Sequence, residues 1–235
     1  MSLAHGPVQH KAGLFLGSLR SVAEMHSPLS RPRILRGPRI DAPLRAPRVR
    51  TERLSLRSYR RADADDWLAI QSVAEVNHYM NWPARDARTS RQHLRDRTHH
   101  TRLSQVDDFL ALAIELDGHV IGDVSLRLKA VHPETRNVEM AWILHPAHSG
   151  HGYATEAVAA LLDLAFDRVG ARWATAFIDL TNVRSIAVAE RLGLTGIPLD
   201  SDTLAFVGSP AIREAQASRQ RLQHDLARHL ERRAS

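Results

Sequence analysis

The chain has 235 residues, 43% of them hydrophobic, which is enough for one sizeable domain with attached segments. It contains no cysteine, and this excludes a disulfide framework, a cysteine-ligated metal site and a thiol nucleophile. The longest apolar runs, 109–114 and 157–162, are far shorter than the roughly 20 residues of a membrane-spanning helix. We therefore expect a cytoplasmic protein without a membrane partner.

The formal net charge of +6 is unevenly distributed along the chain. Residues 1–50 hold nine basic and two acidic side chains, residues 51–208 hold 17 basic and 21 acidic ones, and residues 209–235 hold six basic and three acidic ones. The central region, with a net charge of −4, does not favour nucleic-acid binding. Binding of that kind is expected at most through the basic N-terminal arm.

The N-terminal arm also differs in its pattern from the rest of the chain. Six of the eleven prolines fall in residues 1–50, among arginines and without helical or strand periodicity. We predict that residues 1–47 form a largely disordered extension. Two interpretations stay open: a polybasic arm that binds RNA, DNA or an acidic partner, or a leader without a role, for which Met25 is another candidate start.

From Thr51 onward the hydrophobic pattern alternates between strand and helix periods. We predict strands at 53–57, 109–114, 120–126, 138–144 and 173–178, and helices at 63–76, 90–103, 154–169 and 183–192. Asp117-Gly118 predicts a two-residue hairpin turn, and Gly193 ends the last helix. This order of elements indicates a single mixed α/β domain without internal repeats.

The most informative segment is the loop 145–157, which lies between a predicted strand and the strongest predicted helix. Glycines at 150 and 152 let the backbone approach a ligand, and the first amides of the helix have no partners within it. The segment therefore predicts a diphosphate site. A Walker loop is excluded because no lysine lies here, and the dinucleotide fingerprint fails because residue 155 is threonine.

Five other motifs occur in a fixed order around this loop. They are Thr-Glu-Arg-Leu-Ser-Leu-Arg at 51–57, Val-Ile-Gly at 120–122, Glu-Met-Ala-Trp at 139–142, Asn-Val-Arg-Ser at 182–185 and Ala-Glu-Arg-Leu-Gly at 189–193. With Ser-Gly-His-Gly-Tyr-Ala at 149–154, they resemble the GCN5-related N-acetyltransferase (GNAT) superfamily, in particular its RimJ/RimL-like branch. The resemblance implies a mixed-sheet acyl-CoA N-acyltransferase domain at 51–194.

The resemblance also implies a chemistry and a set of site residues. Acetyl-CoA would be the co-substrate without a metal, and the acceptor would be an amine, either a protein N-terminus or a small molecule, bound by a monomer or homodimer. The −4 charge of the central region favours an acidic cleft for a cationic amine. Cofactor binding would involve Leu144, Ser149, Gly150, His151, Gly152, Tyr153, Ala154, Asn182 and Ser185, and catalysis Glu139 and Ser185.

Each of these roles has an alternative at this stage. Glu139 is either a general base or an outward-facing strand carboxylate, and Asn182 is either a pantetheine ligand or a helix N-cap beside a solvent-facing Ser185. Residue 189 is alanine, so no tyrosine acid is available there. A rival hypothesis groups His145 and His148 with His151 as a metal site in a hydrolase.

Two departures from the family pattern bear on function. Ser149 and His151 stand where Gln or Arg and then Arg or Lys are usual, which predicts weakened rather than lost phosphate binding. Residues 195–208 are poorly patterned where two further strands are expected, and residues 209–235 read as a polar helical tail. The alternative function is therefore a degenerate acyl-CoA-binding module with an incomplete acceptor site and no turnover.

Overall fold

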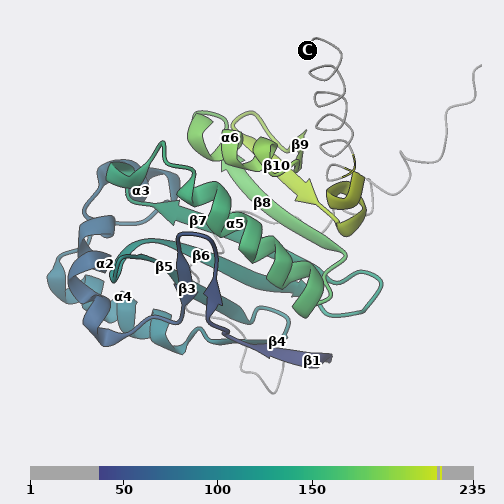
Figure 1. Ribbon diagram of the computed structural model, residues 1–235, viewed down its shortest axis with the longest axis horizontal. Coiled ribbons are helices and arrows are strands. Elements are labelled where there is room, and N and C mark those ends of the chain that lie inside the picture. The colour runs from purple at the N-terminus through teal and green to yellow at the C-terminus, as the bar shows by residue number, and fades with distance from the viewer. Residues whose placement is uncertain (1–36, 216–217, 219–235) are drawn as a thin grey trace, which may run out of the picture. The chain divides into compact units, whose positions relative to one another are not determined.

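The computed structural model describes residues 37–215 and 218, which belong to one compact unit (Figure 1). Its strands are β1 (Arg39–Arg45), β2 (Val49–Arg50), β3 (Ser55–Arg57), β4 (Arg102–Gln105), β5 (Phe109–Leu116), β6 (His119–Ala130), β7 (Asn137–Leu144), β8 (Trp173–Asp179), β9 (Thr195–Pro198) and β10 (Thr203–Gly208). Its α-helices are α2 (Ala64–Gln71), α3 (Ala74–Tyr79), α4 (Ala87–His99), α5 (Tyr153–Asp163) and α6 (Val183–Arg191). Short turns of other helix types are η3 (Arg61–Asp63), η4 (Pro146–His148) and the π-helical η5 (Leu164–Arg168).

Eight strands form one sheet in the order β2-β3-β5-β6-β7-β8-β10-β9, and β1 pairs with β4 in a separate two-stranded sheet. The neighbours in the large sheet are antiparallel except for β7 and β8, which are parallel. The turn between β5 and β6 has positive φ angles at Asp117 and Gly118, as a two-residue hairpin requires. The predicted mixed α/β domain is thereby confirmed, together with its hairpin.

The strands have helices on both faces because their alternate residues are apolar on both sides. One face carries Val138 and Met140 of β7, which share a core cluster with Leu161 of α5. The opposite face carries Ala111 and Ala113 of β5, which pack in a second cluster with α2 and α4. Figure 1 shows α5 running across one face of the sheet and α2 with α4 on the other side. No helix in the described part of the chain is long and apolar enough to cross a lipid bilayer.

Two predictions in the N-terminal half are wrong. Residues 39–45, placed in the disordered extension, form β1, in which Ile40 and Leu44 are buried against the core. Residues 1–36 of that extension lie outside the described residues. The helix predicted at 90–103 ends at His99, and 102–105 is the strand that pairs with β1. Ile40 and Leu44 lie on the same face of β1, but Ala42 between them is exposed, so the buried residues do not alternate regularly along the strand.

The interpretation of residues 195–208 as a departure from the family pattern is also wrong. Residues 195–198 and 203–208 form β9 and β10, and β10 pairs with β8 along its whole length. Residues 210–215 are then helical, as predicted for the start of the tail, and Arg213 is ion-paired with Asp163 of α5. The rest of the tail, apart from residue 218, lies outside the described residues.

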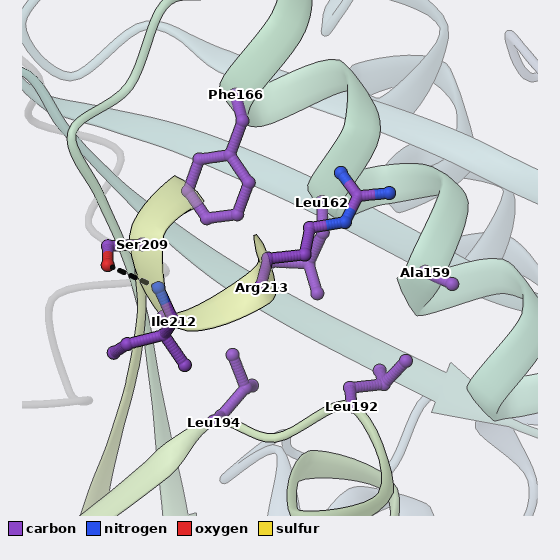
Figure 2. A pocket seen from close by; sticks show the side chains of 9 residues that line it. Ala159, Leu162, Phe166, Leu192, Leu194, Ser209, Ile212 and Arg213 are labelled. Atoms are coloured by element: carbon purple, nitrogen blue, oxygen red, sulfur yellow. Dashed lines mark hydrogen bonds between the residues drawn. The ribbon is translucent and has the colours of Figure 1, made fainter. Parts of the chain in front are cut away.

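A small cavity lies between α5 and this last helical segment. Figure 2 shows Leu162 and Phe166 on one side of it and Ile212 and Arg213 on the other. Its volume of about 50 Å³ is well below the several hundred Å³ that a small-molecule site needs. We interpret it as a packing gap where the tail docks on α5, and not as the active site.

Candidate active site

The parallel strands β7 and β8 separate from each other part-way along the sheet. Their register has three pairs, of which the last is Glu139 with Thr175, although β7 continues to Leu144 and β8 to Asp179. Beyond that pair the facing edges of the two strands have no strand partner among the described residues. Because carboxyl ends of parallel strands lie at the same edge of a sheet, ligands commonly bind there. We call the space between 140–144 and 176–179 the β7–β8 wedge.

The loop that follows β7 has the geometry of an anion site. Gly150 and Gly152 have φ angles of 85° and 81°, in the left-handed region that favours glycine, and both are exposed. Gly152 is the N-cap of α5, and no side chain of the described residues caps this helix, whereas Asp86 caps α4 and Asn182 caps α6. The first amides of α5 are therefore available to phosphate oxygens. Residues 149–152 form this turn, and Tyr153 and Ala154 are the first residues of α5.

An arginine that the sequence analysis did not single out also lies at this loop. Arg53 donates from Nη1 to the carbonyl oxygen of His151 at 2.8 Å, and its guanidinium carbon lies 4.7 Å from the ring centroid of Tyr153. Its Nη2 is 3.4 Å from where a Cβ on Gly152 would stand. Arg53, about 100 residues earlier in the chain, thus places a positive charge beside the loop. Residues 149 and 151 of the loop itself carry no arginine or lysine.

Arg53 is held in place by Glu156 in the first turn of α5. Glu156 accepts hydrogen bonds from Thr51 Oγ1 at 2.5 Å, from the Arg53 amide at 2.8 Å and from Arg53 Nε at 2.7 Å. Burial alone would raise the pKa of Glu156, but these hydrogen bonds and the Arg53 charge outweigh it and lower the pKa. The contact links the 51–57 motif to the glycine loop, because residues 51–53 hold the first turn of α5, the helix that follows the loop.

The loop histidines bond mainly within the loop itself. His145 Nδ1 accepts from the amide of Ala147 at 3.2 Å, and His151 Nδ1 lies 3.0 Å from the carbonyl oxygen of Ser149. Burial, and then the charges of His145 and His151, lower the pKa of His148. Among the described residues, no group of three or more His, Asp or Glu side chains is arranged to hold a metal ion. The geometry therefore gives the metal hypothesis no support.

Glu139 lies inside the sheet at the point where β7 and β8 separate. Its side chain is 8% exposed, and its Oε2 is 3.4 Å from Lys129 Nζ. It is thus not the outward-facing, solvated carboxylate of the alternative interpretation. Leu144, the last residue of β7, pairs with Gly122 of β6, where an added Cβ would meet the carbonyl oxygen of Ile143 at 2.3 Å. Glycine at 122 is therefore needed for close strand packing beside the wedge.

Asn182 and Ser185 lie on the other side of the wedge, where α6 follows β8. Asn182 Oδ1 accepts from the amide of Ser185 at 3.1 Å, so the N-cap role is present. Ser185 is half-buried rather than fully solvent-facing. Ala189 is fully buried in the core, and no phenol can act from that position. The site residues thus form two groups, one at the end of β7 and one at the end of β8.

Comparison with known sequences identifies this arrangement. The family model described as "Acetyltransferase (GNAT) domain" matches residues 53–195, more than half of the chain. The chain belongs to the GNAT acetyltransferases. An N-acetyltransferase of Bacillus licheniformis, p20, described as uncharacterized, is 30% identical to this GNAT chain over 143 residues, which cover 60% of the chain and 79% of the relative.

Solved structures show the same fold. A putative ribosomal-protein-serine acetyltransferase from Vibrio cholerae is 16% identical, has a TM-score of 0.57, and is matched over 71% of this GNAT chain and 99% of its own. The microcin C7 self-immunity acetyltransferase MccE, solved with acetyl-CoA and AMP, is 18% identical with a TM-score of 0.54, over 67% and 93%. The predicted membership of the GNAT superfamily is confirmed, and the chain shares its fold with a putative ribosomal-protein-serine acetyltransferase.

Proposed function

We propose that this GNAT protein transfers the acetyl group of acetyl-CoA to a primary amine, either a protein N-terminus or a small molecule. The observation that carries the proposal is the uncapped start of α5 beside the β7–β8 wedge. The amides of the turn 149–154 would bind the diphosphate, and Arg53 would add a positive charge at its edge. The complex of MccE with acetyl-CoA supports this choice of co-substrate.

The edges of the wedge fit the rest of the co-substrate. The amides of β7 near Leu144 have no partner in the β8 register, so they can hold the pantetheine arm and donate to the thioester carbonyl. Asn182 Nδ2 and the Ser185 hydroxyl would contact the arm from the β8 side, and Ser185 would lie near the departing thiolate. The main effect of these groups is to position the reactants and stabilise the developing oxyanion.

Glu139 is the proposed general base. With Thr175 it forms the last β7–β8 pair, so it lies inside the sheet and beside the wedge, where an incoming ammonium group would lose its proton. Lys129 pairs with the Glu139 carboxylate while no substrate is bound, and this ion pair compensates for the loss of solvent around the buried charge. Proton transfer to Glu139, directly or through one water molecule, leaves a neutral amine that attacks the thioester carbon.

Binding of acetyl-CoA and release of free CoA thiol test the proposal together. We expect the parent to be stabilised by acetyl-CoA and to release thiol in the presence of at least one amine from a panel of peptides and small amines. Gly152→Val should lose the stabilisation because φ is 81° and the added side chain would lie against Arg53. Gly118→Val, at a positive-φ hairpin turn elsewhere in the fold, is the matched control and should keep it.

The binding-module alternative loses its main support. It rested on missing strands after residue 194, and β9 with β10 is present. Acetyl-CoA binding without thiol release for any amine would restore that alternative, and failure of both measurements would overturn the assignment of the loop.

A further inference from the structure

Four side chains form a row across the sheet at the level where β7 and β8 separate. In the strand register Phe109 lies opposite Arg127, Arg127 opposite Glu139, and Glu139 opposite Thr175. Cross-strand partners point to the same face of a sheet. The row therefore leads from Phe109 on β5 to the wedge, along the face that carries α2 and α4.

Phe109 is surrounded by cationic groups. The guanidinium carbons of Arg97 and Arg127 lie 5.3 Å and 5.4 Å from its ring centroid, and the ring of His100 packs edge-on at 4.9 Å. The Arg97 charge is compensated by Asp123, whose two carboxylate oxygens each lie 3.1 Å from Arg97 Nη1. Phe109, Arg127 and His100 are half-buried, so part of each side chain remains accessible to solvent.

Arg85 adds a further positive charge to this group. Its guanidinium carbon lies 5.1 Å from the ring centroid of Trp82, and its Nη1 is buried without a hydrogen-bond partner in the described part of the chain. Burial, and then the charge of Arg97, lower its pKa below the usual value. A buried guanidinium nitrogen without a partner is unfavourable, and a carboxylate or phosphate in a fork geometry is its best partner.

His100 presents a second buried nitrogen of this kind. Its Nδ1 has no hydrogen-bond partner among the described residues. Burial, and then the charges of Arg97 and Arg127, lower the pKa of His100 to about 4. The imidazole is therefore neutral at neutral pH and can donate a hydrogen bond to an acceptor oxygen from one of its nitrogens.

We propose that these residues form an anion subsite of the acceptor site, and that the acceptor is a primary amine carrying a carboxylate or a phosphate. We name it the Phe109 cluster: Trp82, Arg85, Arg97, His100, Phe109 and Arg127. Within and beside it, Asp123 pairs with Arg97 and Glu139 with Lys129, while Arg85 has a guanidinium nitrogen without a partner among the described residues. A cationic subsite differs from the acidic cleft expected from the net charge of 51–208. The inference rests on the proposed function, because Glu139 sets where the amine must lie.

The register also sets the length of the acceptor. Neighbouring strands are spaced by about 4.8 Å, so Phe109, two strands from Glu139, lies about 10 Å away. An amine near Glu139 and an anion beside Phe109, over which the Arg97 and Arg127 guanidiniums lie, would be separated by a spacer of that order, and the Phe109 ring favours an aromatic one.

Matched amine probes test the subsite by direct binding. We would titrate CoA-saturated protein by calorimetry with 4-(aminomethyl)benzoate and with its uncharged amide, and likewise with 4-(aminomethyl)phenyl phosphate and 4-(aminomethyl)phenol. The expected result is that at least one charged probe binds tenfold or more tightly than its neutral partner. The probe pair with the larger ratio of charged to neutral affinity shows whether the natural acceptor carries a carboxylate or a phosphate.

Variants of Arg85 locate the effect. In Arg85→Gln, the affinity for each charged probe should fall to nearly that for its neutral partner. Arg85→Lys should keep part of the difference in affinity because the positive charge remains. Arg88→Gln, an exposed arginine three residues away, is the matched control and should behave like the parent. Thermal melting of each variant shows whether it is folded before its binding is compared.

Three results would overturn the subsite: equal affinities of charged and neutral probes in the parent, a ratio that persists in Arg85→Gln, or no binding of either charged probe at millimolar concentration. These differ from failure of the proposed function, which is read from acetyl-CoA binding and thiol release. If neutral amines are acetylated without any preference for the charged probes, the transferase assignment stands and the subsite falls.

Discussion

Replacing Glu156 tests whether the first turn of α5 depends on the segment 51–53. The Arg53 side chain is 42% exposed and that of Glu156 14%, so solvent screens the ion pair, which contributes at most about 1 kcal/mol. The hydrogen bonds from Thr51 and the Arg53 amide add about 1 kcal/mol each. We expect Glu156→Ala to destabilise the fold by about 2–3 kcal/mol, and Glu156→Gln, which keeps an acceptor oxygen, by about 1 kcal/mol.

Thermal melting followed by circular dichroism measures this difference. For a domain of this size 1 kcal/mol corresponds to about 2–4 °C, so Tm should fall by about 8 °C in Glu156→Ala and about 3 °C in Glu156→Gln. The pKa of Glu156 is lowered in the folded state, so its contribution is present above its unfolded value of about 4.3 and is lost as the pH falls through the folded value. The parent and Glu156→Ala should therefore converge in Tm at acid pH.

Glu190→Ala, an exposed glutamate on α6, is the matched control. If Glu156→Ala melts within about 2 °C of this control at pH 7, the hydrogen bonds of Glu156 do not stabilise the fold as argued. If it is destabilised but binds acetyl-CoA with the parent's affinity, the contact supports α5 without shaping the loop.

Three further outcomes are expected. Gly122→Ala should destabilise the fold by about 2 kcal/mol and weaken acetyl-CoA binding, because its Cβ would lie 2.3 Å from the Ile143 oxygen; urea unfolding and calorimetry measure both effects, and unchanged values would contradict the close packing of β6 on β7. Glu139→Gln should lower kcat at neutral pH with partial recovery at high pH, where the amine arrives deprotonated, while acetyl-CoA affinity stays the same; an identical pH–rate profile would remove Glu139 as the base. A chain starting at residue 48 should be less stable to urea by on the order of 4 kcal/mol than one starting at residue 37, because Ile40 and Leu44 are buried; equal midpoints would show that β1 adds nothing.

The parts of the fold that were predictable are those with a regular hydrophobic period. α5 and the β5–β6 hairpin have apolar residues at helical or strand spacing and turn residues at their ends, so their positions follow from local sequence. β9 shows the opposite case: all four of its residues are exposed, and it is a strand because β10 offers an edge to pair with. β1 likewise depends on β4, a partner about 60 residues away. Pairing of this kind leaves no periodic signal.

The site divides in the same way. The glycine loop was predictable because positive φ and a helix start need particular residue types at adjacent positions. The place of Arg53 was not, because its contact with Glu156 joins segments about 100 residues apart. The cations around Phe109 could not be predicted for another reason: the net charge of a region averages over its whole surface, whereas Arg97 and Arg127 both lie over the Phe109 ring.

The short pairing of β7 with β8 has a consequence for the stability of the sheet itself. Strand pairing divides the eight strands into a block ending at β7 and a block of β8, β10 and β9, joined by three register pairs. A pantetheine chain has amides of its own, and in the wedge it would pair with main-chain groups that the strands leave unpaired. The hydrogen bonds that hold such a ligand would then also hold the two blocks together. Ligand affinity and the resistance of the β8–β10–β9 block to local opening are therefore coupled through the same contacts.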